Sequence, residues 1–561
     1  MLSRRDFLQV AAATASLSSL PQNLVHAAAR QTISQESLLE FDTLGQVTLL
    51  HFTDMHAQIV PLYFREPSEN LGVGYNHGLP PHITGEAFLK HFGLNQSSPE
   101  AHALSSVDFS ALAKSYGRIG GLDRMATLVN AIRADRPNNT LLLDGGDTWQ
   151  GSYTSLKSLG SDMVEVMNAL KVDAMTAHWE FTYGTQRVKE LAEQLNFPFL
   201  AGNVIDTEWE EPVFQATQHF QRGGIKIAVI GQAFPYTPVA NPRYLIDDLS
   251  FGIREEQVQK NVNAAREQGA ELVVLLSHNG FDVDRKMASR VKGIDIILTG
   301  HTHDAIPVSI KVDATLLVAS GSHGKFLSRM DVKMSAGKMV DFRYKLIPIF
   351  SDVIHPDKEI STLVNKIRAP HKQELERVLG HTESLLYRRG NFNGTFDDLI
   401  CQALIKERDA EISLSPGFRW GATLLPGQPI TVEDVYSQTA ITYPKAYRLE
   451  MSGKQLKEIL EDVADNLFNP DPYYQQGGDM VRVGGMGYRI DIKKPIGSRI
   501  SEMTMLGSGK RVDATAQYVV AGWASVNPQT QGPAIYDLLS NFIEAQKVVN
   551  IQPNTAVNVI V

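Results

Sequence analysis

Several short apolar runs in the first half of the chain end on a polar motif, and this pattern constrains the fold more than any other feature. Helical patterns lie between the runs, and such alternation is typical of α/β layers. The predicted strands are Val47–Phe52, Thr140–Leu143, Ile225–Ile230, Leu272–Leu276, Ile294–Leu298 and Leu316–Ala319, and the predicted helices include Leu122–Arg133, Asp162–Leu170 and Glu255–Gln268. Ligands in α/β folds collect at strand ends, where loops converge, so we expect the motifs to share one site.

The polar motifs combine aspartate, histidine and glycine. They are Asp54-Met55-His56, Asp144-Gly145-Gly146-Asp147, Ser277-His278-Asn279 and Gly300-His301-Thr302-His303. In an extended loop, residues i and i+2 point the same way, so Asp54 and His56 could share a cation. Gly300 would let the backbone turn sharply before a second such pair. Each motif alone also has a structural reading, as an acidic turn or a hydrogen-bonded histidine.

Taken together, the motifs indicate a site for two metal ions. A carboxylate such as Asp147 can bridge two cations because each oxygen offers lone pairs. Mixed nitrogen and oxygen ligands suit manganese, iron or zinc. Two ions about 3.5–4 Å apart can hold a hydroxide and stabilise both the attacking and the leaving atom. We therefore predict a two-metal hydrolase with the ligands Asp54, His56, Asp147, His178, His278, His301 and His303.

These motifs resemble the calcineurin-like metallophosphoesterases, specifically their 5′-nucleotidase branch. The resemblance covers roughly Val47 to Arg329, and more loosely the rest of the chain. It implies an N-terminal four-layer α/β-β/α domain and a second α+β domain like the 5′-nucleotidase C-terminal domain. It also implies two ligand sets that share one carboxylate: Asp54, His56, Asp147 and His303 for one metal, and Asp147, His178, His278 and His301 for the other.

One segment departs from the pattern of that family. Where the family usually has Gly-Asn-His-Glu-Phe-Asp, this chain has Ala177-His178-Trp179-Glu180-Phe181-Thr182. His178 replaces the usual asparagine ligand. Trp179 replaces the histidine that assists phosphoester cleavage, and Thr182 replaces the aspartate partner of that histidine. By this comparison the metal ligands are kept and the phosphoesterase acid pair is missing.

The same departure resembles the thiosulfohydrolase family of the bacterial sulfur-oxidation (Sox) pathway. The matching stretches are His51–Gln58, Tyr63–Pro67, Asp144–Ser152, Ala177–Gly184, Ser277–Arg285 and Gly321–Lys325. The resemblance implies an S-sulfosulfanyl-cysteine sulfohydrolase, in which a metal-bound hydroxide releases sulfate from a cysteine S-thiosulfonate on a carrier protein pair. It implies two Mn²⁺ ions, although these ligand types suit other divalent ions. Sulfur leaves readily as an anion, since a thiol pKa is only about 8.5, so Trp179 in place of a protonating histidine fits this catalysis.

Further residues are candidates for substrate contacts. Arg419 in the second domain is the predicted catalytic and sulfonate-binding cation, because arginine binds oxyanions bidentately. The alternative is a surface arginine packed on Trp420. Tyr443, Trp523 and, more weakly, Arg482 are further substrate-binding candidates. His323 and Asn279 are expected to orient the metal ligands.

The chain divides into four predicted segments. These are a twin-arginine export signal at residues 1–29, a catalytic domain at 40–350 with an insertion at about 61–116, a connecting helix at 351–379, and a substrate-binding domain at 380–561. Arg4-Arg5, an apolar stretch and Ala27-Ala28-Ala29 occur in the order of an export signal, which predicts export in the folded state to the periplasm. Cys401 is the single cysteine and lies in an apolar run, so we expect a buried, inert thiol.

Composition excludes some functions and leaves others open. The net charge of −9 argues against a general nucleic-acid binder, and no later stretch is long and apolar enough for a membrane span. Two alternatives to a thiosulfohydrolase remain. One is a 5′-nucleotidase or cyclic phosphodiesterase, and the other is an inactive metal-binding scaffold of a sulfur-oxidation complex.

Overall fold

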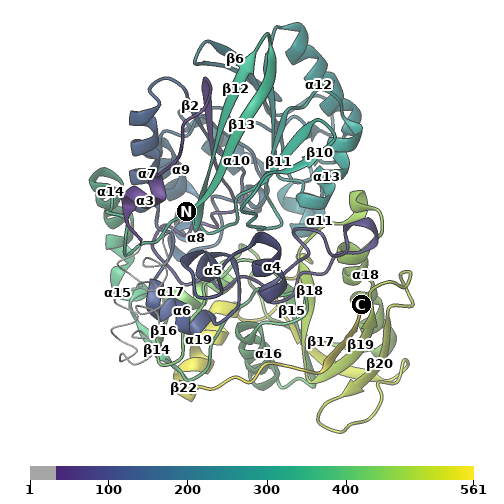
Figure 1. Ribbon diagram of the computed structural model, residues 1–561. Helices are drawn as coiled ribbons and strands as arrows, with labels where there is room; N and C mark the ends of the chain where they lie inside the picture. The colour runs from purple at the N-terminus through teal and green to yellow at the C-terminus, as the bar shows by residue number, and fades with distance from the viewer. Residues whose placement is uncertain (1–32) are drawn as a thin grey trace, which may run out of the picture.

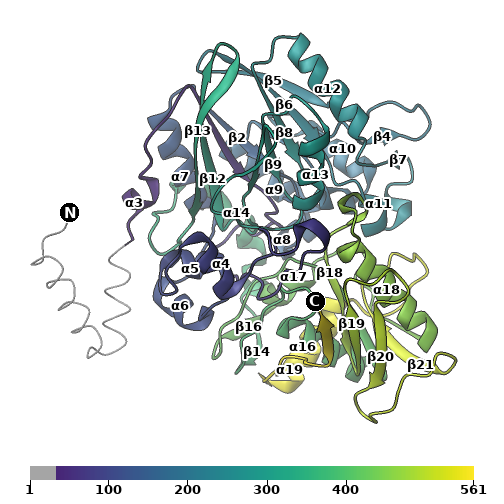
Figure 2. The same ribbon diagram turned by 45° about the vertical axis from the view of Figure 1, so that its right-hand side comes forward.

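The computed structural model describes residues 33–561, and the predicted export signal at residues 1–29 lies outside the described residues. The chain forms two lobes that lie against each other, as Figures 1 and 2 show. The N-terminal lobe, drawn from purple to teal, holds two large sheets. The C-terminal lobe, drawn from green to yellow, holds three smaller sheets.

The first large sheet has five strands in the order β13-β12-β1-β2-β3. The strands β1, β2 and β3 are parallel, whereas β12 is antiparallel to both β1 and β13. Every side chain of β1 and β2 is buried, as expected for strands that are covered on both faces. The bounds are β1 Val47–Phe52, β2 Thr140–Asp144, β3 Ala174–Met175, β12 Phe326–Ser335 and β13 Lys338–Pro348.

The second large sheet has six strands in the order β10-β11-β9-β8-β6-β5. The four central strands are parallel, and the two edge strands are antiparallel to their neighbours. The bounds are β5 Thr217–Arg222, β6 Ile225–Gln232, β8 Leu272–Ser277, β9 Ile296–Thr299, β10 Ile310–Val312 and β11 Thr315–Ala319. A short pair, β4 Ile205–Asp206 and β7 Leu249–Ser250, lies outside both sheets.

The two sheets pack face to face, and helices cover their outer faces. Val47, Leu49 and Leu141 of the first sheet share one buried core with Val274 and Leu298 of the second. The covering helices are α7 Leu122–Asp135 and α9 Ser161–Leu170 on the first sheet, and α12 Glu255–Glu267 and α13 Phe281–Arg290 on the second. This is the predicted four-layer α/β-β/α arrangement. The six strands and three helices that the sequence analysis lists by range all form, with ends within two residues of those predicted, whereas the predicted connecting helix at 351–379 is helical only over residues 358–375.

The insertion at residues 61–116 contains more regular structure than its weak periodicity indicated. It carries three helices, α4 Gly85–Phe92, α5 Pro99–Leu104 and α6 Phe109–Tyr116. The buried ammonium of Lys325 anchors it, since it donates to the carbonyls of Phe64 and Ala103 and to the carboxylate of Glu66. The connector after the first lobe consists of α14 Lys358–Arg368 and α15 Lys372–Leu375, separated by one 3₁₀ turn.

The second lobe is an α+β domain built on three sheets. Their strand orders are β16-β14-β22, β17-β21-β15-β18 and β20-β19-β23. The strands are β14 Val378–Thr382, β15 Ile412–Gly417, β16 Pro429–Thr431, β17 Tyr447–Ser452, β18 Asp479–Gly484, β19 Met486–Asp491, β20 Ile500–Met505, β21 Gln517–Gly522, β22 Val548–Val549 and β23 Val557–Ile560. The main helices are α16 Thr395–Arg408, α17 Val432–Thr439, α18 Gly453–Phe468 and α19 Ile535–Gln546.

The single cysteine lies inside the second lobe. Cys401 is buried in α16, and burial raises the pKa of its thiol. A thiol that stays protonated is a poor nucleophile, which agrees with the predicted inert role. Within residues 33–561, no helix combines the length and the apolar character needed to cross a membrane.

Candidate metal centre

The predicted metal ligands lie just beyond the carboxyl ends of parallel strands from both large sheets. Asp54 follows β1, Asp147 follows β2, and His178 follows β3. His278 comes directly after β8, and His301 follows β9. Because the two sheets pack face to face with these ends together, five separate loops deliver their side chains to one place.

The backbone brings these side chains together in an unusual conformation. Asp54, His56, Asp147, His301 and His303 all have φ between 46° and 74°. This left-handed region is rare for residues other than glycine and is strained, so it persists where the surrounding structure enforces it. The expectation that Asp54 and His56 share an extended loop is therefore wrong. The two side chains converge because both residues adopt left-handed backbone after β1.

Gly300 is needed for a different reason from the predicted one. Its φ is not positive, but a Cβ built there would lie 2.5 Å from Thr53 Oγ1 and 3.0 Å from His278 Nδ1. Those separations are far below van der Waals contact. Gly300 thus allows the loop after β9 to lie directly against the loop after β1, rather than allowing a sharp turn.

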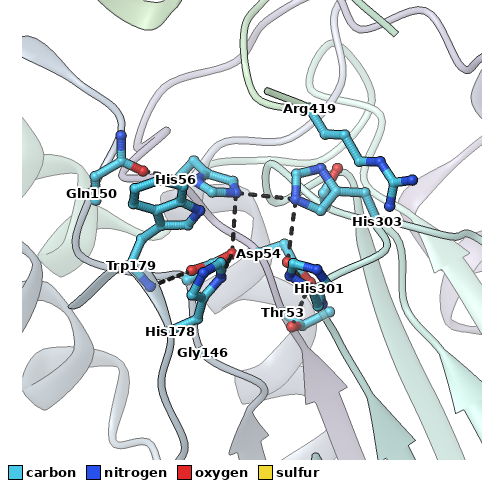
Figure 3. A network of polar contacts seen from close by, with 12 residues as sticks. Thr53, Asp54, His56, Gly146, Gln150, His178, Trp179, His301, His303 and Arg419 are labelled. Atoms are coloured by element: carbon cyan, nitrogen blue, oxygen red, sulfur yellow. Dashed lines mark hydrogen bonds and ion pairs between the residues drawn. The ribbon is translucent and has the colours of Figure 1, made fainter. Parts of the chain in front are cut away.

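Asp147 lies at the centre of the site, part of which Figure 3 shows from close by. Its Oδ2 atom is 3.0 Å from His278 Nε2, 3.2 Å from His178 Nδ1 and 3.6 Å from His56 Nε2. On the other side of the site, Asp54 Oδ1 is 3.2 Å from His303 Nε2. One carboxylate surrounded by three imidazoles is the arrangement expected of a bridging metal ligand.

The predicted ligands form two groups whose donor atoms all lie within 4.8 Å of one another. These groups are Asp54, His56, Asp147 and His303, and Asp147, His178, His278 and His301. They could each hold a metal ion, and Asp147 belongs to both. The residues present fit such ions, since His56 Nε2 and His303 Nε2 face each other at 3.1 Å. His178 Nε2 is buried and has no hydrogen-bond partner among the described residues.

The electrostatics of the site also suit metal binding. Burial lowers the pKa of His178 to about 4, and it lowers the pKa values of His56, His301 and His303. These rings are therefore neutral near pH 7, which is the form that binds metal. His278 differs, because burial disfavours its charge but the adjacent Asp147 and Asp54 raise its pKa to about 10. A cation between these carboxylates would take the place of that proton.

Buried hydrogen bonds hold the ligand loops in place. Glu180 accepts from the backbone N–H of Thr148 at 2.6 Å and from that of His178 at 2.7 Å, which ties the loop after β2 to the loop after β3. His278 Nδ1 lies 2.6 Å from the carbonyl of Gly145. Glu180 was not singled out from the sequence, although it lies in the unusual segment that carries His178 and Trp179.

The two residues expected to orient ligands behave differently from that expectation. The His323 ring packs beside those of His56 and His303 with centroids 5.5 Å and 5.6 Å away, and it hydrogen-bonds to neither. Its Nε2 instead accepts from the backbone N–H of Gly421 in the second lobe. Asn279 donates to Asp284 at 2.9 Å rather than to a ligand histidine.

A cavity of about 220 Å³ opens beside the ligands, between the two lobes. Its lining includes Asp147, His178 and His301 from the first lobe and Arg419 and Asp479 from the second. Part of the remaining wall is aromatic. Phe418 and Trp420 stack in parallel with centroids 4.0 Å apart, and the Trp179 ring meets both edge-on at 5.5 Å and 5.0 Å.

The phosphoesterase acid pair is indeed absent from this wall. The Trp179 side chain presents no titratable group to the cavity, and its backbone N–H donates to Asp147 Oδ1 at 2.7 Å. Thr182 lies at the lobe interface, where its hydroxyl is 2.8 Å from that of Thr442. Neither side chain can supply a proton as a histidine–aspartate pair would.

Arg419 lines the cavity, but the protein already engages much of its guanidinium. Nη2 donates to the carbonyl of Gly478 at 2.5 Å, Nη1 donates to that of Thr302 at 3.3 Å, and Nε lies 3.5 Å from Asp479. Only the contact with Thr302 crosses the lobe interface, because Gly478 and Asp479 lie in the same lobe as Arg419. Arg419 therefore joins the lobes as well as contributing positive charge to the cavity.

Arg389 is a second cation near the site that the sequence reasoning missed. It is buried, and within the described residues its Nε and Nη1 have no hydrogen-bond acceptor. Its charge lies close enough to contribute to the lowered pKa values of His303 and Arg419, which burial mainly causes. Buried arginines are rarely left unpaired. Its donors are therefore available to an anion, and no spacing motif in the sequence indicates this.

The other substrate-binding candidates lie outside the cavity lining. The Tyr443 hydroxyl donates to the carbonyl of Ala240, and Trp523 Nε1 donates to Ser415 Oγ at 2.9 Å. Arg482 pairs with Asp397 and Asp479 at 3.2 Å and 3.1 Å. All three are satisfied inside the protein, which gives them structural roles in this arrangement.

The fold and the site are those of the 5′-nucleotidase branch of the calcineurin-like metallophosphoesterases. The family model described as "5'-nucleotidase, C-terminal domain" matches residues 378–533. A 5′-nucleotidase of Bos taurus is 25% identical over 455 residues, which are 73% of this chain and 76% of the bovine protein. A 5′-nucleotidase precursor of Thermus thermophilus has the same fold, with a TM-score of 0.72 and 21% identity over 92% of this chain and 99% of that one.

A sulfate thiohydrolase, SoxB, of Thermus thermophilus is more similar. It superposes with a TM-score of 0.90 and 36% identity, over 93% of this chain and 98% of that chain. The chain therefore belongs to the SoxB sulfate thiohydrolase family and carries a domain of the 5′-nucleotidases.

Removing one ligand tests the metal assignment. We expect His178→Ala to weaken metal binding by more than the roughly 10–100-fold that loss of an outer hydrogen-bond partner costs, and to lower turnover in parallel. His178→Asn is the matched control, since an amide oxygen can still donate to the ion. Metal content after gel filtration measures the effect. Normal metal content and turnover in His178→Ala would remove this residue from the ligand set.

Proposed function

We propose that the protein is a dimetal thiosulfohydrolase that releases sulfate from a cysteine S-thiosulfonate on a carrier protein. Water attacks the terminal sulfonate sulfur, the bond from that sulfur to the neighbouring sulfur breaks, and the cysteine persulfide leaves as an anion. Sulfate and the two protons of the water are released. The observation that carries this proposal is the similarity to a sulfate thiohydrolase along nearly the whole of both chains. It is supported by a site that keeps the metal ligands but lacks the acid pair.

The residues of the cavity suit each part of this reaction. Two divalent ions, for which we propose Mn²⁺, would supply Lewis-acid catalysis and lower the pKa of water when bound to the two ligand groups. Arg419, which lines the cavity, would hold the sulfonate oxygens, and we propose that the free donors of Arg389, which lies outside the cavity lining, assist it. The rings of Trp179, Phe418 and Trp420 would exclude bulk water from the scissile bond.

The leaving group explains why the cavity needs no proton donor at Trp179. An alkoxide must be protonated as it leaves, which a histidine does in phosphoester cleavage. A persulfide is a far weaker base and leaves as an anion, as a thiol pKa of about 8.5 indicates. We propose further that the chain acts in the periplasm after twin-arginine export, where it meets a cysteine-bearing pair of sulfur-carrier proteins.

One assay separates this function from its alternatives. The metal-loaded protein is offered a carrier bearing a cysteine S-thiosulfonate, and in parallel 5′-AMP and a cyclic nucleotide, while sulfate and phosphate release are measured. We expect sulfate from the carrier and little phosphate. Efficient phosphate release without sulfate would make the protein a nucleotidase or phosphodiesterase. Full metal occupancy without either product would make it an inactive scaffold.

Restoring the missing acid pair should restore phosphoester chemistry. In Trp179→His combined with Thr182→Asp, we expect phosphoesterase activity to rise by roughly 10²-fold, the usual contribution of a placed general acid. Thr182→Asp alone is the control, since it breaks the contact with Thr442 without adding a donor. No gain in the metal-loaded double variant would count against this explanation of Trp179.

A further inference from the structure

One ligand histidine of the second metal group touches the second lobe directly. His301 Nε2 lies 2.9 Å from the backbone carbonyl of Gln476, in the loop before β18. A carbonyl oxygen only accepts hydrogen bonds, so the proton of the neutral ring must be on Nε2. This leaves the lone pair of Nδ1 for a metal ion. The tautomer of His301 is thus set by the second lobe.

The tautomer of His56, a ligand in the first metal group, also depends on the second lobe, but through the side chain of Gln150. Gln150, shown beside His56 in Figure 3, donates from Nε2 to the carbonyl of Ala440 at 2.6 Å. Because the group that donates to a carbonyl must be the NH2 group, the other end of the amide is the oxygen. This oxygen, Oε1, lies 3.1 Å from His56 Nδ1. His56 must carry its proton on Nδ1 to donate there. Its Nε2 lone pair then faces His303 Nε2, which lies 3.1 Å away in the same group of metal ligands.

A third contact brings the lobes together beside the same ligands. The backbone N–H of Gly421 in the second lobe donates to His323 Nε2 at 3.2 Å. The His323 ring packs against those of His56 and His303. By contrast, His278 takes its orientation from Gly145, within the first lobe. The second lobe therefore contacts one ligand histidine in each metal group: His56, through Gln150, in the first group and His301 in the second.

We infer that the second lobe completes the dimetal centre by selecting the metal-binding tautomer of one histidine at each metal, with Gln150 as a positioning residue. Metal affinity and the packing of the two lobes are then linked. Contacts that orient a ligand typically contribute 10–100-fold to metal affinity. Linkage is reciprocal, so metal binding strengthens the contacts of Gln476 and Ala440 by the same factor. The inference rests on the two-metal site but not on the proposed substrate.

Two adjacent glycines in the second lobe allow a matched test. Gly477 and Gly478 have nearly the same left-handed backbone, with φ of 71° and 78°. A Cβ at Gly477 would lie 2.4 Å from His301 Nε2, whereas a Cβ at Gly478 would have its nearest neighbour, the carbonyl oxygen of Gly417, at 3.6 Å. Gly477→Ala and Gly478→Ala therefore carry similar backbone strain, but only the first displaces the metal ligand.

The measurement is metal stoichiometry and affinity, using Mn²⁺ titration and the absorption spectrum of the Co²⁺-loaded protein. We expect Gly477→Ala to bind one of the two ions at least about 10-fold more weakly than Gly478→Ala does, with an altered Co²⁺ spectrum. Equal affinity and equal spectra in the two variants would overturn the inference. This measurement uses no substrate, so a failed carrier assay would not change its result. Equally, a failed metal-binding test would not decide whether the protein releases sulfate from the carrier.

Gln150 provides a second test that does not depend on a strained loop. Gln150→Glu keeps an acceptor for His56 Nδ1 but loses the donor to Ala440, and Gln150→Leu loses both. We expect metal affinity at one site to fall in the order wild type, Gln150→Glu, Gln150→Leu. We also expect metal loading of the wild type to slow hydrogen exchange in the segments around Ala440 and Gln476. Unchanged affinity in Gln150→Leu, or exchange that does not respond to metal, would contradict the linkage.

Discussion

Replacing Asp147 by asparagine is expected to abolish both metal sites at once. Its Oδ2 lies within 3.6 Å of nitrogen atoms of three ligand histidines, and the residue belongs to both donor groups. A neutral amide removes the charge that two cations share and cannot bridge them with two oxygens. Because the ions contribute several kcal/mol to catalysis, turnover should fall by roughly 10³-fold or more.

The control for this variant lies in the same loop. Asp144 is equally buried, and it accepts from Gly146 N and from the Thr148 hydroxyl, but it belongs to neither metal group. Asparagine can make the same contacts, so Asp144→Asn should keep two ions per chain. Metal content by elemental analysis and sulfate release are measured on both variants. Two tightly bound ions in Asp147→Asn would refute the bridging role.

Replacing Arg389 by methionine is expected to lower kcat/KM without lowering stability. Each charge-assisted hydrogen bond to the sulfonate contributes roughly 1.5–3 kcal/mol, so losing two of them should reduce kcat/KM by about 10²-fold or more. In the free protein the same guanidinium is buried with unpaired donors, which is unfavourable. Methionine removes that cost, so the temperature of unfolding should stay the same or rise.

Replacing Arg419 by methionine is expected to lower the unfolding temperature, in contrast to Arg389→Met. Its guanidinium bonds to Gly478 and Thr302 and lies beside the buried carboxylate of Asp479. Arg419→Met breaks two contacts inside the second lobe and one to the first lobe, and it removes one of the cations that pair with Asp479, so the unfolding temperature should fall together with activity. Thermal unfolding and sulfate-release kinetics are measured on both variants. A destabilised Arg389→Met would mean that Arg389 is structural and not a substrate-binding residue.

The sequence was sufficient to predict which aspartates and histidines lie together in the two donor groups, and to predict the layers of the first lobe. Apolar runs such as Val47–Phe52 predict strands because their burial on both faces demands continuous apolar side chains. Histidine and aspartate directly after such runs predict a metal site because strand ends converge. The backbone at Asp54 and His56 was not predictable, since left-handed conformations at such residues are imposed by neighbouring loops.

Contacts between the lobes account for most of what the sequence did not reveal. Arg389, Gln150 and Glu180 follow no spacing pattern. Gln150 contacts His56 and Ala440 and Glu180 contacts Thr148, all far along the chain, and two donors of Arg389 have no acceptor among the described residues. Tyr443 and Trp523 were reasonable aromatic candidates, but their hydrogen bonds are made inside the protein. Whether an aromatic side chain faces a cavity depends on which neighbours cover it, and that is decided only on folding.

The sequence by itself determined that Asp54, His56, Asp147, His178, His278, His301 and His303 form one site. Residue type fixes which atoms can bind a metal, and strand ends fix where those atoms meet. Only the tertiary structure decided which nitrogen of His56 and His301 is free to do so. That choice belongs to carbonyl groups of a second lobe far along the chain, because a neutral imidazole places its proton wherever an acceptor lies.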